Sequence, residues 1–110
     1  MRSKIFGLVG EYFTMFLYMI RFYKILAHRM RNMAGEIDII VKSNREIIFV
    51  EVKSRKYKFA DYDCSKNQIT RIKNAALIYI SQNPQFKDCQ MRFDLVIIRP
   101  YQLPQIIRNI

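Results

Sequence analysis

The chain has 110 residues, enough for one hydrophobic core and too few for two, so a single domain over residues 1–110 is expected. It is 51% hydrophobic with only three glycines and three prolines, which excludes a disordered or low-complexity chain. Nineteen Lys and Arg against nine Asp and Glu give a formal net charge of +10. A polyanion, either nucleic acid or an anionic membrane, is the natural partner, although many basic proteins bind neither.

The N-terminal stretch Phe6–Leu26 is apolar, but Glu11, Arg21 and Lys24 interrupt it. Its longest uncharged run in the middle, Tyr12–Ile20, is far shorter than the roughly 20 apolar residues of a membrane-spanning helix. No small-residue cleavage site of a signal peptide follows. The sequence therefore predicts no membrane span and no secretory signal.

The cysteines and the single histidine do not suit a zinc site. Cys64 and Cys89 are not spaced as a C-x-x-C pair, and His28 has no second histidine nearby. Two reduced thiols in a cytoplasmic protein are the expectation, with a disulfide between them left open.

The first element is expected to be a helix from Gly7 to Arg21. Its apolar residues recur at steps of three and four, which predicts one buried face made of Leu8, Tyr12, Met15, Met19 and Phe22. The segment Tyr23–Arg31 that follows has a weak strand pattern.

Two further strands are predicted at Glu36–Lys42, where apolar and charged residues alternate, and at Ile47–Lys53, which is rich in β-branched residues. Residues 43–46 between them, Ser-Asn-Arg-Glu, are typical of a turn. The pair is therefore expected to form an antiparallel hairpin.

The rest of the chain adds a helix and one or two strands. Helical spacing runs from about Ser65 to Gln82 and ends before Pro84. A strand is expected at Met91–Ile98, and Gln105–Ile110 is a candidate edge strand. The order helix, three strands, helix, strand predicts an α/β fold, with a central mixed sheet flanked by helices.

The hydrophobic pattern selects one register for the hairpin, in which facing residues have numbers that sum to 89. It sets Ile37 opposite Val52, Ile39 opposite Val50 and Val41 opposite Ile48, so that one face is wholly apolar. On the other face the same register sets Asp38 opposite Glu51 and Glu36 opposite Lys53, with facing Cβ atoms roughly 5 Å apart.

Two carboxylates this close repel unless a cation lies between them, and Mg²⁺ binds through one or two carboxylates while it keeps waters. Asp38 and Glu51 are therefore the predicted ligands of Mg²⁺ or Mn²⁺. The plainer alternative is an exposed sheet face on which Glu36 pairs with Lys53 and Asp38 is solvated. Against that alternative, Ile40 and Phe49 share the face and are poorly placed in open water.

Two polar residues on the helices are further candidates. Glu11 is the only acid among the first 35 residues and lies among apolar helix positions, so either it reaches the hairpin site or it extends to solvent. Gln68, at the edge of the second helix's apolar stripe, is either a capping residue or a site residue.

The ordered motifs resemble those of the YraN family, small bacterial proteins of the PD-(D/E)XK nuclease-like superfamily, over nearly the whole chain. The matching blocks are GEYF at 10–13, YKILAHRMR at 23–31, GEIDII at 35–40, IFVEVKSR at 48–55 and MRFDLVII at 91–98. The resemblance implies a restriction-endonuclease-like core. It also implies that Asp38, Glu51 and Lys53 bind Mg²⁺ and orient the hydrolytic water, with Glu11 and Glu36 as further site residues. The chain departs from the family in residues 54–67, which lack glycines and look shortened, and at Gln68, where a lysine is expected.

The expected function is metal-dependent hydrolysis of phosphodiester bonds in nucleic acid, with DNA as the substrate that the resemblance implies. Basic residues outside the metal site are expected to grip phosphates, or else form an ordinary solvated face: Arg55, Lys56, Lys58, Lys66, Arg71 and Lys73. Two rival hypotheses are a catalytically inert nucleic-acid-binding protein of the same fold and an interfacial membrane anchor formed by the N-terminal helix. A homodimer stays open.

Overall fold

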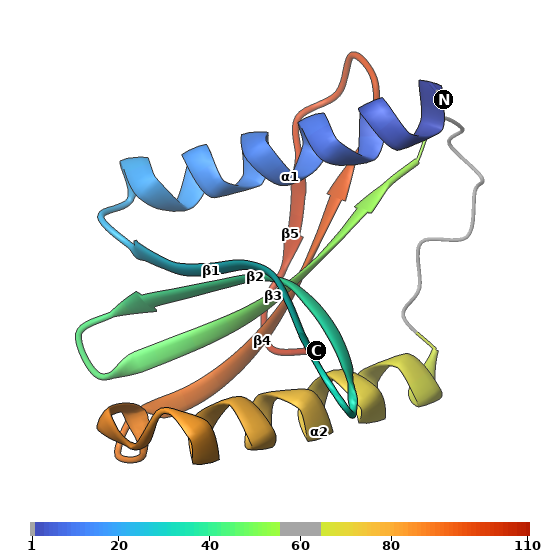
Figure 1. Cartoon of the computed structure of the whole chain (residues 1–110). Helices are drawn as coiled ribbons and strands as arrows, with labels where there is room; N and C mark the ends of the chain where they lie inside the picture. The colour runs from blue at the N-terminus through green and yellow to red at the C-terminus, as the bar shows by residue number, and fades with distance from the viewer. Residues whose placement is uncertain (1, 56–64) are drawn as a thin grey trace.

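The chain folds around one five-stranded mixed sheet, in a computed structural model that describes residues 2–55 and 65–110 (Figure 1). The strands lie in the order β1-β2-β3-β4-β5, and every neighbouring pair is antiparallel except β3 and β4, which are parallel. The elements are α1 (Arg2–Ile20), β1 (Lys24–Asn32), β2 (Gly35–Ser43), β3 (Glu46–Ser54), α2 (Lys66–Gln82), the 3₁₀ turn η1 (Pro84–Phe86), β4 (Gln90–Ile98) and β5 (Gln105–Ile107). The predicted α/β class and the predicted order of elements are confirmed.

The two helices cover opposite faces of the sheet (Figure 1). The strand β3 is buried on both sides, because Ile48 and Val50 belong to the apolar cluster under α1 while Ile47 and Phe49 belong to the cluster under α2. This is why residues Ile47–Val50 of β3 form an unbroken apolar run and do not alternate with polar residues. The face that the predicted register made wholly apolar is the one that α1 covers.

The second helix begins with a capping box at the residue that the sequence indicated. Ser65 Oγ accepts the backbone N–H of Gln68 at 3.1 Å, and the Gln68 side chain accepts the backbone N–H of Ser65 at 3.4 Å. These bonds satisfy donors that the first helical turn leaves unpaired. Since α2 follows β3 and precedes the parallel strand β4, it is the crossover element that a parallel pair requires.

The apolar spacing predicted the buried face of α1 only in part, since Leu8 and Met15 are half-buried and Met15 packs against the core under this helix. Tyr12 and Met19, assigned to the buried stripe, are more than half exposed, and Phe22 beyond the helix is 91% exposed. The buried positions are instead Gly10, Thr14 and Tyr18, four residues apart. Gly10 and Thr14 are small, which lets the helix approach the sheet closely. The two buried hydroxyls have partners: Thr14 Oγ1 donates to the Gly10 carbonyl, and the Tyr18 hydroxyl donates to Asp94.

The C-terminal segment pairs for fewer residues than predicted. β5 spans Gln105–Ile107 only, although Ile110 still donates its backbone N–H to the Phe93 carbonyl at 2.7 Å. Of the two cysteines, Cys89 is a free, half-buried thiol, and Cys64 lies outside the described residues. No helix in the described part of the chain is long and apolar enough to cross a bilayer.

Candidate functional site

The candidate site lies where β2 separates from β3. The predicted register holds from Ser43–Glu46 up to Ile39–Val50, and there the ladder ends. Beyond this point a side chain of β2 binds the backbone of β3 in place of the ladder: Oδ2 of Asp38 accepts a hydrogen bond from the backbone N–H of Val52 at 2.8 Å. The carboxylate thus satisfies a strand amide that no β2 carbonyl reaches.

The separation of the strands overturns part of the predicted register. Ile37 was predicted to face Val52 on the same apolar face of the hairpin as Ile39, but it packs in the cluster under α2, whereas Ile39 packs in the cluster under α1. In the neighbouring strand β1, Arg29 has a left-handed φ of 57°, and the register of the β1–β2 ladder shifts between Ile25 and Ala27. A non-glycine residue in that region of φ is uncommon within a strand. Arg29 lies opposite Asp38, since His28 pairs with Ile39 and Met30 with Ile37, so this unusual backbone conformation is next to the candidate site.

The carboxyl groups of Asp38 and Glu51 lie within hydrogen-bonding distance of each other at this fork. Burial, together with the hydrogen bond and the negative charge of Glu51, raises the pKa of Asp38 to about 9, against the Val52 amide, whose hydrogen bond lowers it. Lys53 lies on the same strand with its Nζ 3.5 Å from Glu51 Oε2, and both side chains are only 13–15% exposed. Two carboxyls and one ammonium thus share a largely covered space, as the sequence indicated.

Glu36 does not take the place that was predicted for it. Its carboxylate pairs with Arg31 of β1 at 2.7 Å on an exposed edge, and Lys53 pairs with Glu51 instead. The prediction that Glu36 faces Lys53 is wrong, and so is the alternative built on their ion pair. The physical reason is that the first residues of β2 pair with β1 and have already left β3.

Glu11 turns toward the sheet and not to solvent. Its Oε1 lies 2.7 Å from His28 Nε2 and accepts a hydrogen bond from Arg29 Nε at 3.0 Å, and its side chain is 13% exposed. The negative charge of Glu11 also raises the pKa of Asp38, as the smallest of the causes named for that carboxyl. Glu11 therefore lies beside the carboxyl pair, held by two side chains of β1.

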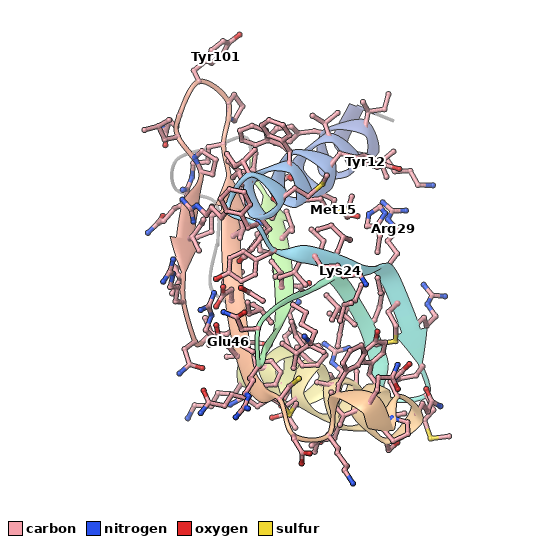
Figure 2. All side chains as sticks on the ribbon, turned by 90° about the vertical axis from the view of Figure 1, so that its left-hand side faces the viewer. Tyr12, Met15, Lys24, Arg29, Glu46 and Tyr101 are labelled. Carbon is pink, nitrogen blue, oxygen red and sulfur yellow. The ribbon has the colours of Figure 1, made fainter. Side chains whose placement is uncertain are left out.

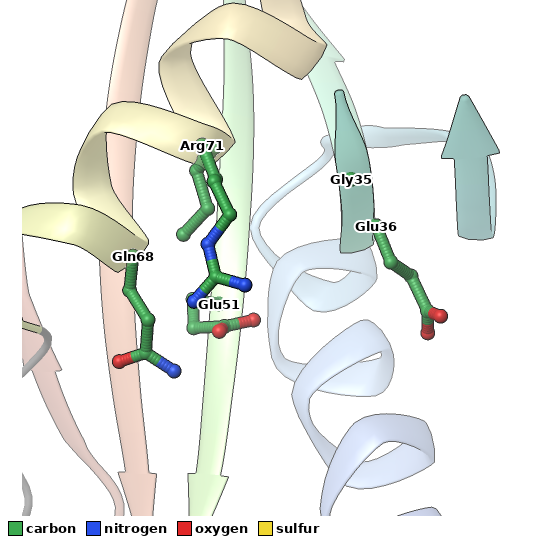
Figure 3. Close-up of a pocket in the computed structure, with 6 residues that line it drawn as sticks. Gly35, Glu36, Glu51, Gln68 and Arg71 are labelled. Atoms are coloured by element: carbon green, nitrogen blue, oxygen red, sulfur yellow. The ribbon is translucent and has the colours of Figure 1, made fainter. Parts of the chain in front are cut away.

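A pocket of about 180 Å³ opens next to the carboxyl pair, between the start of β2, β3 and α2. Figure 3 shows the Gln68 and Arg71 side chains extending from α2 toward the strand that carries Glu51, while Glu36 points away from them. The pocket is lined by Gly35, Glu36, Glu51, Gln68, Arg71 and Ile72. Gln68 is thus both the capping residue and a pocket residue, the two roles that the sequence left open.

The basic residues predicted to bind phosphates are not gathered in one place. Arg71 lines the pocket, whereas Lys73 lies over the Phe93 ring at 5.6 Å from its centroid. Lys66 is exposed in the first turn of α2, and Arg55 donates from its guanidinium to the Ser54 carbonyl at 3.1 Å. Lys56 and Lys58 lie outside the described residues. Among the described members of this set, Arg71 is the one placed beside the carboxyl pair.

The donor set fits a hard divalent cation that keeps most of its water. Among the described residues, no three carboxylate, imidazole or thiol side chains converge on one point. Mg²⁺ needs only one or two protein carboxylates, however, because it retains waters as its other ligands. Burial is the main cause of the raised pKa of Asp38 and the negative charge of Glu51 adds to it, and a bound cation would favour the ionised carboxylate against both. Asp38 and Glu51 are the residues that could hold it.

Sequence reasoning missed His28 and Arg29. The single histidine was considered only as a zinc ligand, and the strand around it only as a weak pattern. Both residues are hydrogen-bonded to the Glu11 carboxylate, and this hydrogen bond raises the pKa of Arg29 above its usual value. The one available signal was that Glu11, the lone acid of its region, is followed by the basic run His28–Arg31.

Comparison with known proteins shows the family. The profile of the Uncharacterised protein family UPF0102 matches residues 10–98. A UPF0102 protein of Rhodopseudomonas palustris (strain BisA53) is 38% identical over 100 residues, which are 90% of this chain and 77% of that protein. One from Nitrobacter winogradskyi is 39% identical over 84 residues, covering 76% and 71% of the two chains, and one from Mesorhizobium japonicum is 34% identical over 101 residues, covering 91% and 81%. The chain therefore belongs to the UPF0102 family.

Proposed function

We propose that this protein is a metal-dependent nuclease of the PD-(D/E)XK type, the superfamily to which the YraN-like motifs point. The observation that carries the proposal is the meeting of Asp38 and Glu51 at the β2–β3 fork with Lys53 beside them. Its chemistry is general: paired carboxylates bind a hard cation, and an adjacent ammonium offsets negative charge on a reacting phosphate. The order of elements and the mixed sheet agree with such a core.

In this proposal Asp38 and Glu51 hold Mg²⁺ or Mn²⁺, which when bound lowers the pKa of water and polarises the phosphate. The Val52 amide donates to Oδ2 of Asp38 and so fixes the position of this side chain. Lys53 orients the attacking water and neutralises charge that develops on the phosphate oxygens. Glu11, held by His28 and Arg29, adds negative potential that favours the cation.

The substrate class in the proposal is nucleic acid, with DNA favoured, in the cytoplasm. A net charge of +10 gives the electrostatic attraction that phosphate backbones require. In the pocket, Arg71 places a guanidinium next to Glu51. A guanidinium can bind a phosphate through two parallel hydrogen bonds, so this residue is a candidate phosphate ligand beside the metal site. Gln68 can donate from its amide to a second phosphate or sugar oxygen.

The alternative keeps the fold and the charge without catalysis. Gln68 is a neutral side chain at a position where the family resemblance led us to expect a lysine, so the pocket holds one positive charge fewer. A protein of this kind binds nucleic acid in a salt-sensitive way and leaves it intact. Cleavage assays separate the two functions.

The test uses the full chain with linear, single-stranded and branched DNA and with RNA, each in Mg²⁺, Mn²⁺ and a chelator. We expect metal-dependent cleavage by the wild type that Asp38→Asn and Glu51→Gln abolish. Asp88→Asn, which removes an exposed carboxylate elsewhere, is the matched control and should cut normally. Salt-sensitive binding without cleavage of any substrate would select the inert alternative, and neither binding nor cleavage would reject both.

Titration calorimetry with Mg²⁺ or Mn²⁺ tests the metal site independently of any substrate. Wild type should bind the ion, and Asp38→Ala should bind it at least about tenfold more weakly, since one carboxylate cannot replace two. Equal affinities would remove Asp38 from the site even if cleavage were observed.

A further inference from the structure

The outer side of α1 is an apolar surface that the fold leaves uncovered. Seven of its large apolar side chains are each between 42% and 58% exposed, namely Ile5, Val9, Tyr12, Phe13, Phe16, Met19 and Ile20. At 3.6 residues per turn they stand within an arc of roughly 120° on one side of the helix. Contiguous apolar patches of this kind on a protein surface mark sites of contact with another protein, a membrane or a ligand. We call these seven side chains the α1 face.

The charges around the α1 face are almost all positive. Lys4 stands near one end of the helix, and Arg21 and Lys24 are exposed just beyond the other. The only acid of the helix, Glu11, points inward to His28 and Arg29 and is 13% exposed. An anionic partner is therefore favoured at both ends of the face, and nothing acidic on α1 opposes it.

A pocket beside the α1 face is lined by both apolar and positively charged side chains. It measures about 210 Å³ and lies between α1 and β1, lined by Lys4, Ile5, Leu8 and Arg29. Figure 2 shows Tyr12 of α1 and Arg29 of β1 on the same flank of the molecule. Two apolar side chains and two cations in one pocket suit an amphiphile with a negatively charged head and a hydrocarbon tail.

We propose that the α1 face docks on the surface of an anionic phospholipid bilayer. The helix lies in the interfacial plane with its apolar side chains among the upper acyl groups, and Lys4, Arg21 and Lys24 meet the headgroup phosphates. The pocket of Lys4 and Arg29 takes the phosphate of one lipid at the edge of the contact. This inference is independent of the nuclease proposal.

A bilayer fits these observations better than a second copy of the chain. Both ends of the α1 face carry positive charge that no ion pair among the described residues offsets, so two copies packed on it would bring like charges together in either orientation of the helices. Anionic headgroups supply the missing negative charge. The docked protein also keeps its pocket beside Glu51 free, because that pocket is lined from α2 on the opposite face of the sheet (Figure 1).

The experiment measures co-sedimentation of the full chain with phosphatidylcholine vesicles, with and without phosphatidylglycerol. A chain of charge +10 can bind anionic vesicles through charge alone, so the decisive variant removes apolar area and keeps every charge. Phe13→Ser combined with Phe16→Ser should weaken binding to the anionic vesicles by about tenfold or more. Leu77→Ser combined with Leu103→Ser, two exposed positions off α1, is the matched control and should bind as wild type does.

A fluorescent reporter gives a second measurement that does not depend on the serine variant. The chain has no tryptophan, so Phe16→Trp reports on one position of the α1 face. Its emission should shift to the blue on anionic vesicles, and Lys4→Glu with Arg21→Glu should reduce this shift.

Three results would overturn the proposal. One is equal loss of vesicle binding in the serine pair on α1 and in the control pair. Another is an emission of Phe16→Trp that stays unchanged on vesicles to which the protein binds. The third is a wild-type dimer that Phe13→Ser/Phe16→Ser dissociates, without vesicle binding, which would assign the α1 face to a second copy.

Discussion

The carboxylate of Asp38 accepts the backbone N–H of Val52 at 2.8 Å, at the point where the β2–β3 ladder has just ended. A side chain thus does what a strand carbonyl does elsewhere in the sheet, and this draws Asp38 into the gap between the two strands. Glu51, the residue before Val52, is brought against it. The candidate metal site is therefore a consequence of how the sheet opens.

Lys53 separates catalysis from metal binding. Lys53→Ala removes a positive charge beside Glu51, so affinity for Mg²⁺ should persist or rise. Turnover should fall by roughly a hundredfold or more if Lys53 stabilises the transition state. Calorimetry and single-turnover cleavage measure the two effects. Full cleavage by Lys53→Ala would leave Lys53 as only the ion-pair partner of Glu51.

The raised pKa of Asp38 predicts a pH-dependent stability in the absence of divalent cations. Because the folded chain holds this proton more tightly than the unfolded chain does, the stabilising contribution is complete below about pH 4. It is lost as the pH rises through about 9. The free energy of unfolding of wild type, measured with a chelator present, should therefore fall relative to that of Asp38→Asn across this range. A constant difference between the two proteins would show that the Asp38 carboxyl is not coupled to folding.

Magnesium should reverse this loss. At pH 8 the cation binds the folded chain and should raise the melting temperature of wild type. Asp38→Asn should show little change, and Asp88→Asn should respond as wild type does. A rise in melting temperature common to all three proteins would indicate a general salt effect.

Asp94 should be essential for stability and not for chemistry. It is fully buried and accepts hydrogen bonds from Tyr18, from Arg92 and from the backbone of Asn109. Asp94→Ala should destabilise the protein by about 3–5 kcal/mol, because it leaves the largely buried Arg92 without this partner. Tyr18→Phe removes one hydrogen bond and should cost about 1 kcal/mol. Urea unfolding measures both, and equal costs would contradict the central role of the carboxylate.

The close approach of α1 to the sheet depends on a missing side chain at Gly10. A Cβ there would collide with Ser54 Oγ, which is buried and has no hydrogen-bond partner among the described residues. Gly10→Ala should therefore destabilise the fold by about 1–3 kcal/mol, partly offset by better helix propensity. Gly7→Ala, which meets no atom within 4 Å, should instead stabilise by up to about 1 kcal/mol.

Ser54→Ala supplies the second arm of that test. It removes the colliding oxygen, and the remaining contacts of a Cβ at Gly10, with Ile98 at 3.5 and 3.7 Å, are ordinary. The cost of Gly10→Ala should largely disappear in this background. Purely additive effects in the double-mutant cycle would place the constraint somewhere other than this contact.

Local chemistry made much of this protein predictable. The alternation of Ile37–Val41 with charged residues and the β-branched run around Phe49 predicted the hairpin and its register as far as Ile39–Val50. Ser65 and Gln68 marked the start of α2. These features depend on neighbours in the sequence or on the facing strand of a short hairpin, and periodicity records such neighbours.

The sequence by itself determined the order of the elements and the identity of the carboxyl pair, because both follow from short-range patterns. Only the tertiary structure decided which face of α1 is buried, since that depends on the bond between Tyr18 and Asp94, 76 positions apart. It also decided that Glu36 pairs with Arg31 and that Arg71 reaches the pocket. The pairing of Glu36 depends on where β2 leaves β3, and the other two depend on how a helix packs on the sheet. Periodicity along the chain encodes neither the point at which a ladder ends nor contacts between residues far apart in the sequence.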